Sequence, residues 1–153
     1  MRLTRRFIIK SLDGLNLSDA VRYERYYIND NLRVQRKGDK LEKEILNEKN
    51  DITEKIIITE KEFENLKKSA YSEIIRDSYL YLKDNKISIK KYYGIYSGLN
   101  RIEVEFHSIE EMNNYTKENW MEEEITDNPL AFDKFLSKLS QNEFLVELEK
   151  YLK

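Results

Sequence analysis

A short run of strict alternation between apolar and acidic residues constrains the fold more than any other part of this chain. It spans Ile102 to Phe106, where Ile102, Val104 and Phe106 are apolar and Glu103 and Glu105 are acidic. A period of two is typical of a β-strand that buries one of its faces. One face of the predicted strand therefore carries two carboxylates.

A helix is predicted directly after this strand. Ser108 and Glu111 have the spacing of a capping box, in which each side chain accepts a hydrogen bond from the backbone of the other residue. The predicted helix spans residues 109–118. A second short strand follows, and the sequence Asp127-Asn128-Pro129 ends that strand and opens a new helix.

Length and composition indicate one domain. A chain of 153 residues is long enough for a single substantial core, and glycine (4) and proline (1) are too scarce for a linker. We therefore expect one domain over residues 1–153. The predicted parts are a first strand group (1–58), a crossover helix (59–70), a second strand group that contains the helix described above (71–126), and C-terminal helices (129–153).

The charge balance and the absence of cysteine narrow the classes of function. Lys+Arg 27 against Asp+Glu 29 is nearly balanced, so nucleic-acid binding is not indicated. Without cysteine, disulfides and thiolate chemistry are excluded. No apolar run approaches the roughly 20 residues of a membrane span, and no signal-peptide core follows Met1. We expect a soluble, cytoplasmic protein that does not contact membranes.

The order of motifs late in the chain resembles one family. An acidic strand, a helix and a W-x-x-x-E-I-T segment follow one another, as in the CYTH domain of the triphosphate tunnel metalloenzymes. The matching residues are Gly98-Leu99, Glu103, Glu105, Trp120, Glu124, Ile125 and Thr126, whereas Glu122 replaces a small residue of the family. The resemblance implies an α+β fold, in which eight antiparallel strands close into a tunnel barrel with flanking helices and a C-terminal helical pair.

The resemblance also implies a site inside that tunnel, where basic side chains hold a triphosphate and acidic ones hold Mg²⁺ or Mn²⁺. Inward positions of a closed barrel bring that many charges together. The cations expected to bind phosphate are Arg2, Arg6, Arg33, Lys43, Arg76 and Lys90. The acids expected to bind metal are Glu54, Glu103 and Glu105.

Three acidic positions of the family are changed in this sequence. The first strand of the family reads E-x-E-x-K, and the corresponding residues here are Arg2, Thr4 and Arg6, so the cation is kept and both acids are lost. Lys90 stands where the family has the aspartate of D-x-F-x-G. Because a cation at a metal position repels the metal, we expect two-metal triphosphatase chemistry to be impaired.

Three functions remain open at this stage. The first is a tunnel protein that captures a phosphorylated polyanion, such as a nucleotide, a triphosphate or polyphosphate, without turning it over. The second is a metal-dependent triphosphatase or an adenylate cyclase-like enzyme, with one metal held by Glu103, Glu105 and Glu54. The third is an interaction protein in which inward arginines and glutamates pair with each other. The sequence assigns no catalytic residue and does not determine the oligomeric state.

Overall fold

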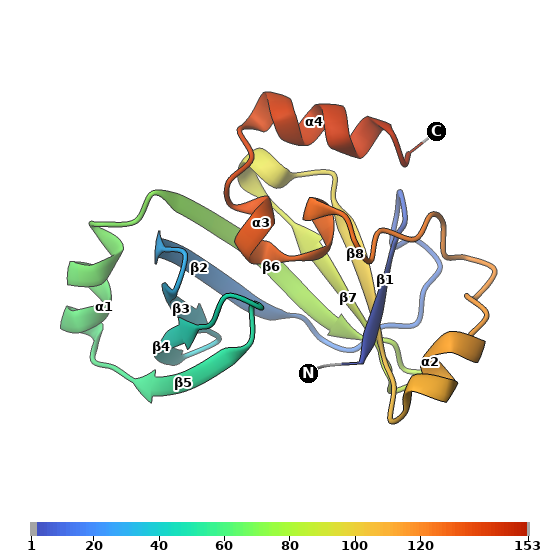
Figure 1. Ribbon diagram of the computed structural model, residues 1–153, viewed down its shortest axis with the longest axis horizontal. Helices are drawn as coiled ribbons and strands as arrows, with labels where there is room; N and C mark the ends of the chain where they lie inside the picture. Colours follow the sequence, from blue (N-terminus) through green and yellow to red (C-terminus); the bar gives the residue numbers. More distant parts are fainter. Residues whose placement is uncertain (1–2, 153) are drawn as a thin grey trace.

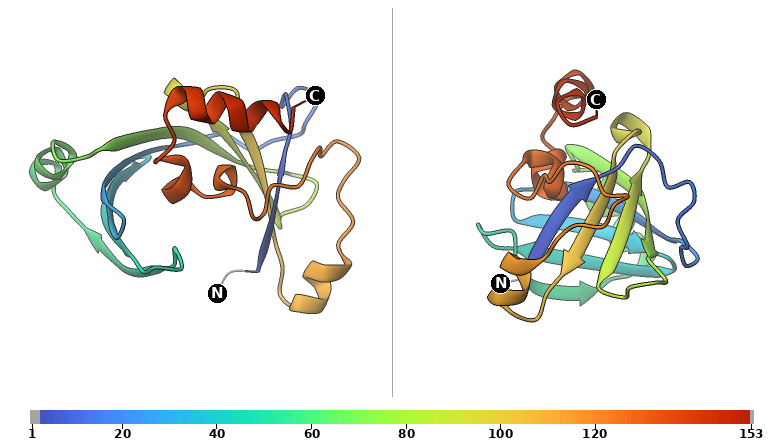
Figure 2. Two further views of the ribbon diagram at one scale, coloured as in Figure 1. Left: turned by 45° about the horizontal axis from the view of Figure 1, so that its top comes forward. Right: turned by 90° about the vertical axis from the view of Figure 1, so that its right-hand side faces the viewer.

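Eight antiparallel strands form one continuous sheet in the computed structural model, which describes residues 3–152. Neighbouring strands follow the order β1-β8-β7-β6-β2-β3-β4-β5. The sheet curls strongly and has a concave and a convex side (Figure 1, Figure 2). The strands in chain order are β1 (Thr4–Ile8), β2 (Val21–Asn29), β3 (Leu32–Lys37), β4 (Lys40–Leu46), β5 (Ile52–Ile57), β6 (Ser72–Leu80), β7 (Ile87–Tyr92) and β8 (Asn100–Glu105).

The helices are short and lie on both sides of the sheet. The α-helices are α1 (Glu60–Lys67), α2 (Ile109–Asn114), α3 (Asp133–Leu136) and α4 (Gln141–Glu149), and the 3₁₀ helices are η1 (Gly94–Tyr96) and η2 (Pro129–Ala131). Figure 2 shows η2 and α3 within the concave side, with α4 beyond them. None of the helices formed by residues 3–152 is long and apolar enough to cross a membrane.

Alternation along β8 places different chemistry on the two sides of the sheet. Ile102 and Val104 are buried in an apolar cluster on the convex side. Arg101 and Glu103 are also buried, but they project from the opposite face and line a cavity on the concave side. Successive side chains of a strand point to opposite faces, so the predicted alternation accounts for this division. Both faces are covered, and the buried charges must find partners within the protein.

Three apolar clusters attach the helices to the sheet. Two of them lie on the convex side, one under α2 and the segment after it, and the other under α1. The third lies at one end of the concave side and contains residues from five strands together with the C-terminal helices. Its buried members include Ile8, Tyr27, Leu46, Ile74, Tyr92, Leu99, Leu130, Leu136 and Phe144. The charged residues occupy the next positions along the same face, such as Arg6 beside Ile8 and Arg101 beside Leu99.

The predicted closed barrel is wrong in one respect, because the two edge strands β1 and β5 do not pair with each other in the described part of the chain. The free edge of β1 is taken by the W-x-x-x-E-I-T segment. Ile8 N–H donates to the Glu123 carbonyl at 3.0 Å, and Ile125 N–H donates to the Arg6 carbonyl at 2.9 Å. Because these bonds use the outer edge of β1, that edge has no position for β5. The sheet therefore remains an open, curled trough.

Two helical segments differ from their predicted bounds. The capping bond from Glu111 N–H to Ser108 Oγ forms at 3.1 Å, but α2 ends at Asn114 instead of residue 118. Tyr115 is extended and packs its ring on Phe106 at a centroid distance of 5.2 Å. Within the predicted C-terminal helices (129–153), the first part forms two separate short helices, η2 and α3, because Phe132 between them is extended. Local patterning predicts these helices, and tertiary packing decides where they end.

We expect Phe144→Ala to lower the free energy of unfolding by about 3–5 kcal/mol, because it removes a fully buried ring that packs edge-on against Tyr96 at 5.3 Å. Val146 lies on the same helix with 58% of its surface exposed, so Val146→Ala is the matched control with an effect within about 0.5 kcal/mol. Urea unfolding followed by circular dichroism measures both values. Equal losses in the two variants would contradict the packing of α4 on the concave cluster.

Candidate functional site

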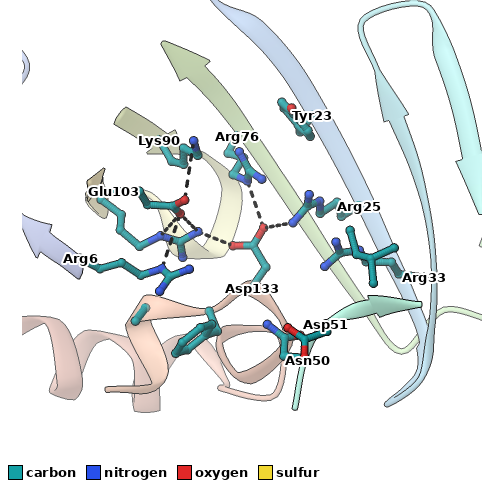
Figure 3. A pocket seen from close by; sticks show the side chains of 14 residues that line it. Arg6, Tyr23, Arg25, Arg33, Asn50, Asp51, Arg76, Lys90, Glu103 and Asp133 are labelled. Atoms are coloured by element: carbon teal, nitrogen blue, oxygen red, sulfur yellow. Dashed lines mark hydrogen bonds and ion pairs between the residues drawn. The ribbon is translucent and has the colours of Figure 1, made fainter. Parts of the chain in front are cut away.

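The concave side of the sheet holds a cavity of ≈ 600 Å³ beside the apolar cluster. Six cationic side chains line it, and they come from β1, β2, β3, β6, β7 and β8. These cations are Arg6, Arg25, Arg33, Arg76, Lys90 and Arg101. Three acids also line the cavity, namely Asp51, Glu103 and Asp133. Figure 3 shows the labelled arginines, Lys90 and Glu103 converging on one space from the strands, and Asp133 entering it from α3.

Glu103 is the centre of one group of charges. Its carboxylate lies 2.9 Å from Arg101 Nη2, 3.8 Å from Arg6 Nε and 3.9 Å from Lys90 Nζ. Strand register explains the grouping, since Arg6 is the direct partner of Glu103 across β1 and β8. Burial raises the pKa of the Glu103 carboxyl, but the three cations outweigh burial and hold this pKa well below its usual range. Glu103 is therefore ionised and shared among several cations.

Asp133 is the centre of a second group. Its Oδ2 atom lies 2.8 Å from Arg25 Nη1 and 3.0 Å from Arg76 Nε, and its Oδ1 atom lies 3.3 Å from Arg101 Nη2. The Tyr92 hydroxyl donates a hydrogen bond to the same carboxylate. Burial acts to raise the pKa of Asp133, but the arginines and the tyrosine hold it well below its usual range. Arg101 contacts both acids and joins the two groups into one network.

The β3–β4 wall of the cavity carries a third ion pair. Arg33 donates from Nε to Glu44 at 2.7 Å and from Nη1 to the Tyr27 hydroxyl at 3.0 Å. Arg33 and Glu44 are directly opposite each other across β3 and β4. Lys55 on β5 approaches the same glutamate at 3.3 Å. Arg33 is therefore already paired on this wall, and the five other cations of the cavity lie on the remaining strands.

Aromatic rings fix the planes of several guanidinium groups. Arg76 lies over the ring of Tyr23 at 4.3 Å from the centroid, and Arg25 lies over the same ring at 5.3 Å. Arg6 lies over Phe132 at 4.4 Å. Contact between a cation and the face of an aromatic ring is favourable and leaves the N–H groups at the guanidinium edge for hydrogen bonds. The cations are thus held in fixed orientations before any ligand arrives.

Five of the nine residues proposed from the sequence line this cavity, namely Arg6, Arg33, Arg76, Lys90 and Glu103. Arg2 lies outside the described residues, so its predicted role stays a prediction. Glu105 shares the inward face with Glu103, but it is exposed at the end of β8 and does not line the cavity.

The structure does not bring Lys43 and Glu54 to the cavity. On β4, Glu42 and Glu44 are the buried inward residues, and Lys43 between them points to the convex side. Glu54 pairs with Ile45 on that same outer side, whereas its neighbour Lys55 faces Glu44. Because side chains alternate with a period of two, a register error of one residue moves a side chain to the other face.

Sequence reasoning missed four charged residues that line the cavity, namely Arg25, Asp51, Arg101 and Asp133. Arg101 had a clear signal, because it precedes Glu103 by two positions in the alternating strand and must share its face. Arg25 is directly opposite Gln35 across β2 and β3, and Gln35 shares a face with Arg33, so the register of these strands places Arg25 on the cavity side. Asp133 had no such signal, since it follows an extended residue between two short helices. Only the tertiary fold places Asp133 among the arginines.

The acids present do not fit the Mg²⁺ or Mn²⁺ site that the family resemblance implies. Such ions need several oxygen ligands close together, but Glu103 is surrounded by cations and Glu54 lies on the opposite face. Between residues 3 and 152, no group of three or more histidine, cysteine, aspartate or glutamate side chains is arranged to hold a metal ion. We therefore assign no metal ligand and derive no step through a metal.

We expect Glu103→Gln to lower the free energy of unfolding near neutral pH, because it leaves buried Arg6 and Arg101 and half-buried Lys90 with less compensation. A carboxyl with a depressed pKa stabilises the fold above its unfolded-state pKa, and this stabilisation is lost as the pH falls through the folded-state pKa. The gap between wild type and variant should therefore narrow below about pH 4. Urea unfolding from about pH 7 to about pH 3 tests this, and a constant gap would contradict it.

Comparisons with known proteins support the fold but do not assign the chain to a family. No family model and no curated protein match this sequence. A crystal structure described as that of the hypothetical protein NE1496 is 21% identical, with a TM-score of 0.73 over 90% of this chain and 97% of that chain. Another, described as that of the inorganic triphosphatase NE1496, is 20% identical, with a TM-score of 0.74 over 92% of this chain and 96% of that chain. The likeness is one of fold, and it agrees with the tunnel-type sheet that the CYTH resemblance implied.

Proposed function

We propose that this protein binds a phosphorylated polyanion in the concave cavity and that binding does not require a divalent metal. The observation that carries the proposal is the excess of positive charge, since six cationic and three acidic side chains line one cavity in a chain whose formal net charge is -2. Charge of one sign concentrated in a concave site attracts ligands of the opposite sign. The cavity volume of ≈ 600 Å³ is within the usual range for small-molecule sites.

The internal ion pairs leave donor capacity for such a ligand. A guanidinium has five N–H donors, and an ionised carboxylate accepts at two oxygens. Glu103 and Asp133 are each shared among three cations, so the cations of the cavity outnumber the acids that neutralise them. Phosphoryl oxygens form strong charge-assisted hydrogen bonds with arginine and lysine. Several phosphoryl groups in one ligand would engage cations on opposite walls of the cavity.

A triphosphate or a nucleoside triphosphate is the ligand class we favour. The protein NE1496, whose fold this chain shares, is described as an inorganic triphosphatase. That description supports a triphosphate as ligand and keeps metal-dependent hydrolysis or cyclisation as the alternative function. The cations around Glu103 disfavour the alternative, because they occupy the space in which a metal would approach that carboxylate.

A third reading treats the arginines and acids as purely structural partners of each other on an interaction scaffold. The ion pairs of Arg33 with Glu44 and of Arg76 with Asp133 favour it. The cavity and its excess of positive charge disfavour this purely structural interpretation, because a network of internal ion pairs requires neither an open cavity nor unbalanced charge. Ligand binding separates this reading from the first.

Isothermal titration with tripolyphosphate and with ATP, each with and without Mg²⁺, is the direct test. We expect binding without metal, and we expect it to weaken as salt is raised, because opposite charges are screened. No heat and no thermal shift with either ligand at low salt would reject the proposal. The same samples are then assayed for released phosphate and pyrophosphate. Release that requires Mg²⁺ or Mn²⁺ would establish the enzymatic alternative.

Lys90→Ala should weaken tripolyphosphate binding by about tenfold, the size expected for losing one charge-assisted hydrogen bond. The matched control is Lys91→Ala, which removes the same charge from the adjacent, exposed position on the opposite face of β7. We expect binding by the control to change by less than about twofold. Equal weakening in both variants would mean that only overall charge matters, and it would contradict binding in the cavity.

A further inference from the structure

We infer that Arg25, Arg76, Arg101 and Tyr92 form an anion subsite that is built into the fold and occupied by the protein's own Asp133. The subsite has the size and hydrogen-bonding pattern to hold one carboxylate or one phosphate group. Asp133 positions the three arginines and sets the depth to which an external polyanion enters the cavity. The statement about ligand depth rests on the proposed function, whereas the subsite itself rests on geometry alone.

The donors come from four neighbouring strands of the sheet. Arg101 lies on β8, Tyr92 on β7, Arg76 on β6 and Arg25 on β2, and these strands are consecutive in the sheet order. Arg76 and Tyr92 are direct partners across β6 and β7. The sheet therefore presents a row of cations and one hydroxyl to one point, with nitrogen–oxygen distances of 2.8 Å and 3.0 Å for the hydrogen-bonded ion pairs of Arg25 and Arg76 and 3.3 Å for the ion pair of Arg101.

The acceptor comes from a separate part of the chain. Asp133 begins α3, which enters the concave side and is far in sequence from all four donors. Its neighbours Leu130, Ala131 and Leu136 have no exposed surface and belong to the apolar cluster at the end of the trough. Moving Asp133 away from the arginines would therefore unpack that cluster. An external ligand binds beside Asp133 in preference to displacing it.

Two consequences follow from an internal anion at this place. The guanidinium groups of buried Arg76 and Arg101 and of half-buried Arg25 repel each other, so the carboxylate is needed to hold them together. The carboxylate also fills a position at the end of the cavity that an anionic group of an external ligand could otherwise occupy. Removing the Asp133 side chain should open the subsite to a small anion from solution and extend the site for a longer polyanion.

Chemical rescue of Asp133→Ala tests the subsite. We expect the variant to have a lower melting temperature than wild type in sodium chloride. Formate or inorganic phosphate at equal ionic strength should raise it by several degrees more than they raise the wild type, because ligands that bind the folded state stabilise it. Asp133→Asn, which fills most of the space, should show a smaller rescue. Equal responses of wild type and Asp133→Ala to both anions would overturn the inference.

Asp77→Ala is the matched control. The Asp77 carboxylate accepts from Arg22 Nε at 2.6 Å and from the Tyr93 hydroxyl at 2.8 Å, but Arg22 is half exposed and Asp77 does not line the cavity. We expect no rescue by formate or phosphate in this variant. If Asp133→Ala does not fold in chloride, refolding in phosphate replaces the thermal shift, and failure of both Asp133 variants to fold in any of the anions would overturn the inference.

Titration of tripolyphosphate into the same variants separates this inference from the proposed function. We expect Asp133→Ala to bind tripolyphosphate about tenfold more tightly than wild type, because the deepest phosphoryl group gains the subsite. Rescue by formate with no tripolyphosphate binding to wild type would sustain the subsite and reject the proposed function. Tripolyphosphate binding to wild type with no rescue of Asp133→Ala would reject the subsite and leave the proposed function in place.

Discussion

Burial of arginine on the concave side of the sheet is the constraint on which the rest of the structure depends. A buried guanidinium without a partner is strongly destabilising, and the cavity walls contain several. Glu44, Glu103 and Asp133 meet this requirement from β4, β8 and α3. The ion network therefore links both halves of the sheet to the C-terminal segment, and the apolar cluster beside it holds that segment in place. Charge compensation and packing support each other here.

The same ion network favours an anion-binding site over a metal site. A metal site needs acids that are close together and open to the ion, whereas here Glu103 and Asp133 are both enclosed by cations. Aromatic rings and carboxylates hold the guanidinium groups in fixed orientations, which lowers the cost of ordering them around a ligand. This preorganisation supports the proposed binding of a ligand that brings its own negative charge. A shared fold with NE1496 is compatible with such a change of chemistry, because function depends on the site and not on the fold.

Much of the fold was predictable because its signals are local. Alternation placed Glu103 on the inward face of its strand, and the Ser108–Glu111 spacing marked the start of α2. Lys43 was placed on the wrong face because the buried inward positions of β4 hold glutamates, where a lysine was expected. Glu54 was placed on the wrong face because β5 is an edge strand with little hydrophobic pattern from which to read its register. The predicted closure failed because strand periodicity does not say which segment takes a free edge.

The sequence by itself determined which side chains share a face, since the period of a strand depends only on the chain's own backbone geometry. It also determined that this face would carry more cations than the CYTH pattern implies, at Lys90 above all. Only the tertiary structure decided that residues 122–126 take the free edge of β1 and that Asp133 enters the arginine cluster. Both depend on contacts between segments far apart in the chain, whose energies come from burial and charge compensation and leave no local pattern.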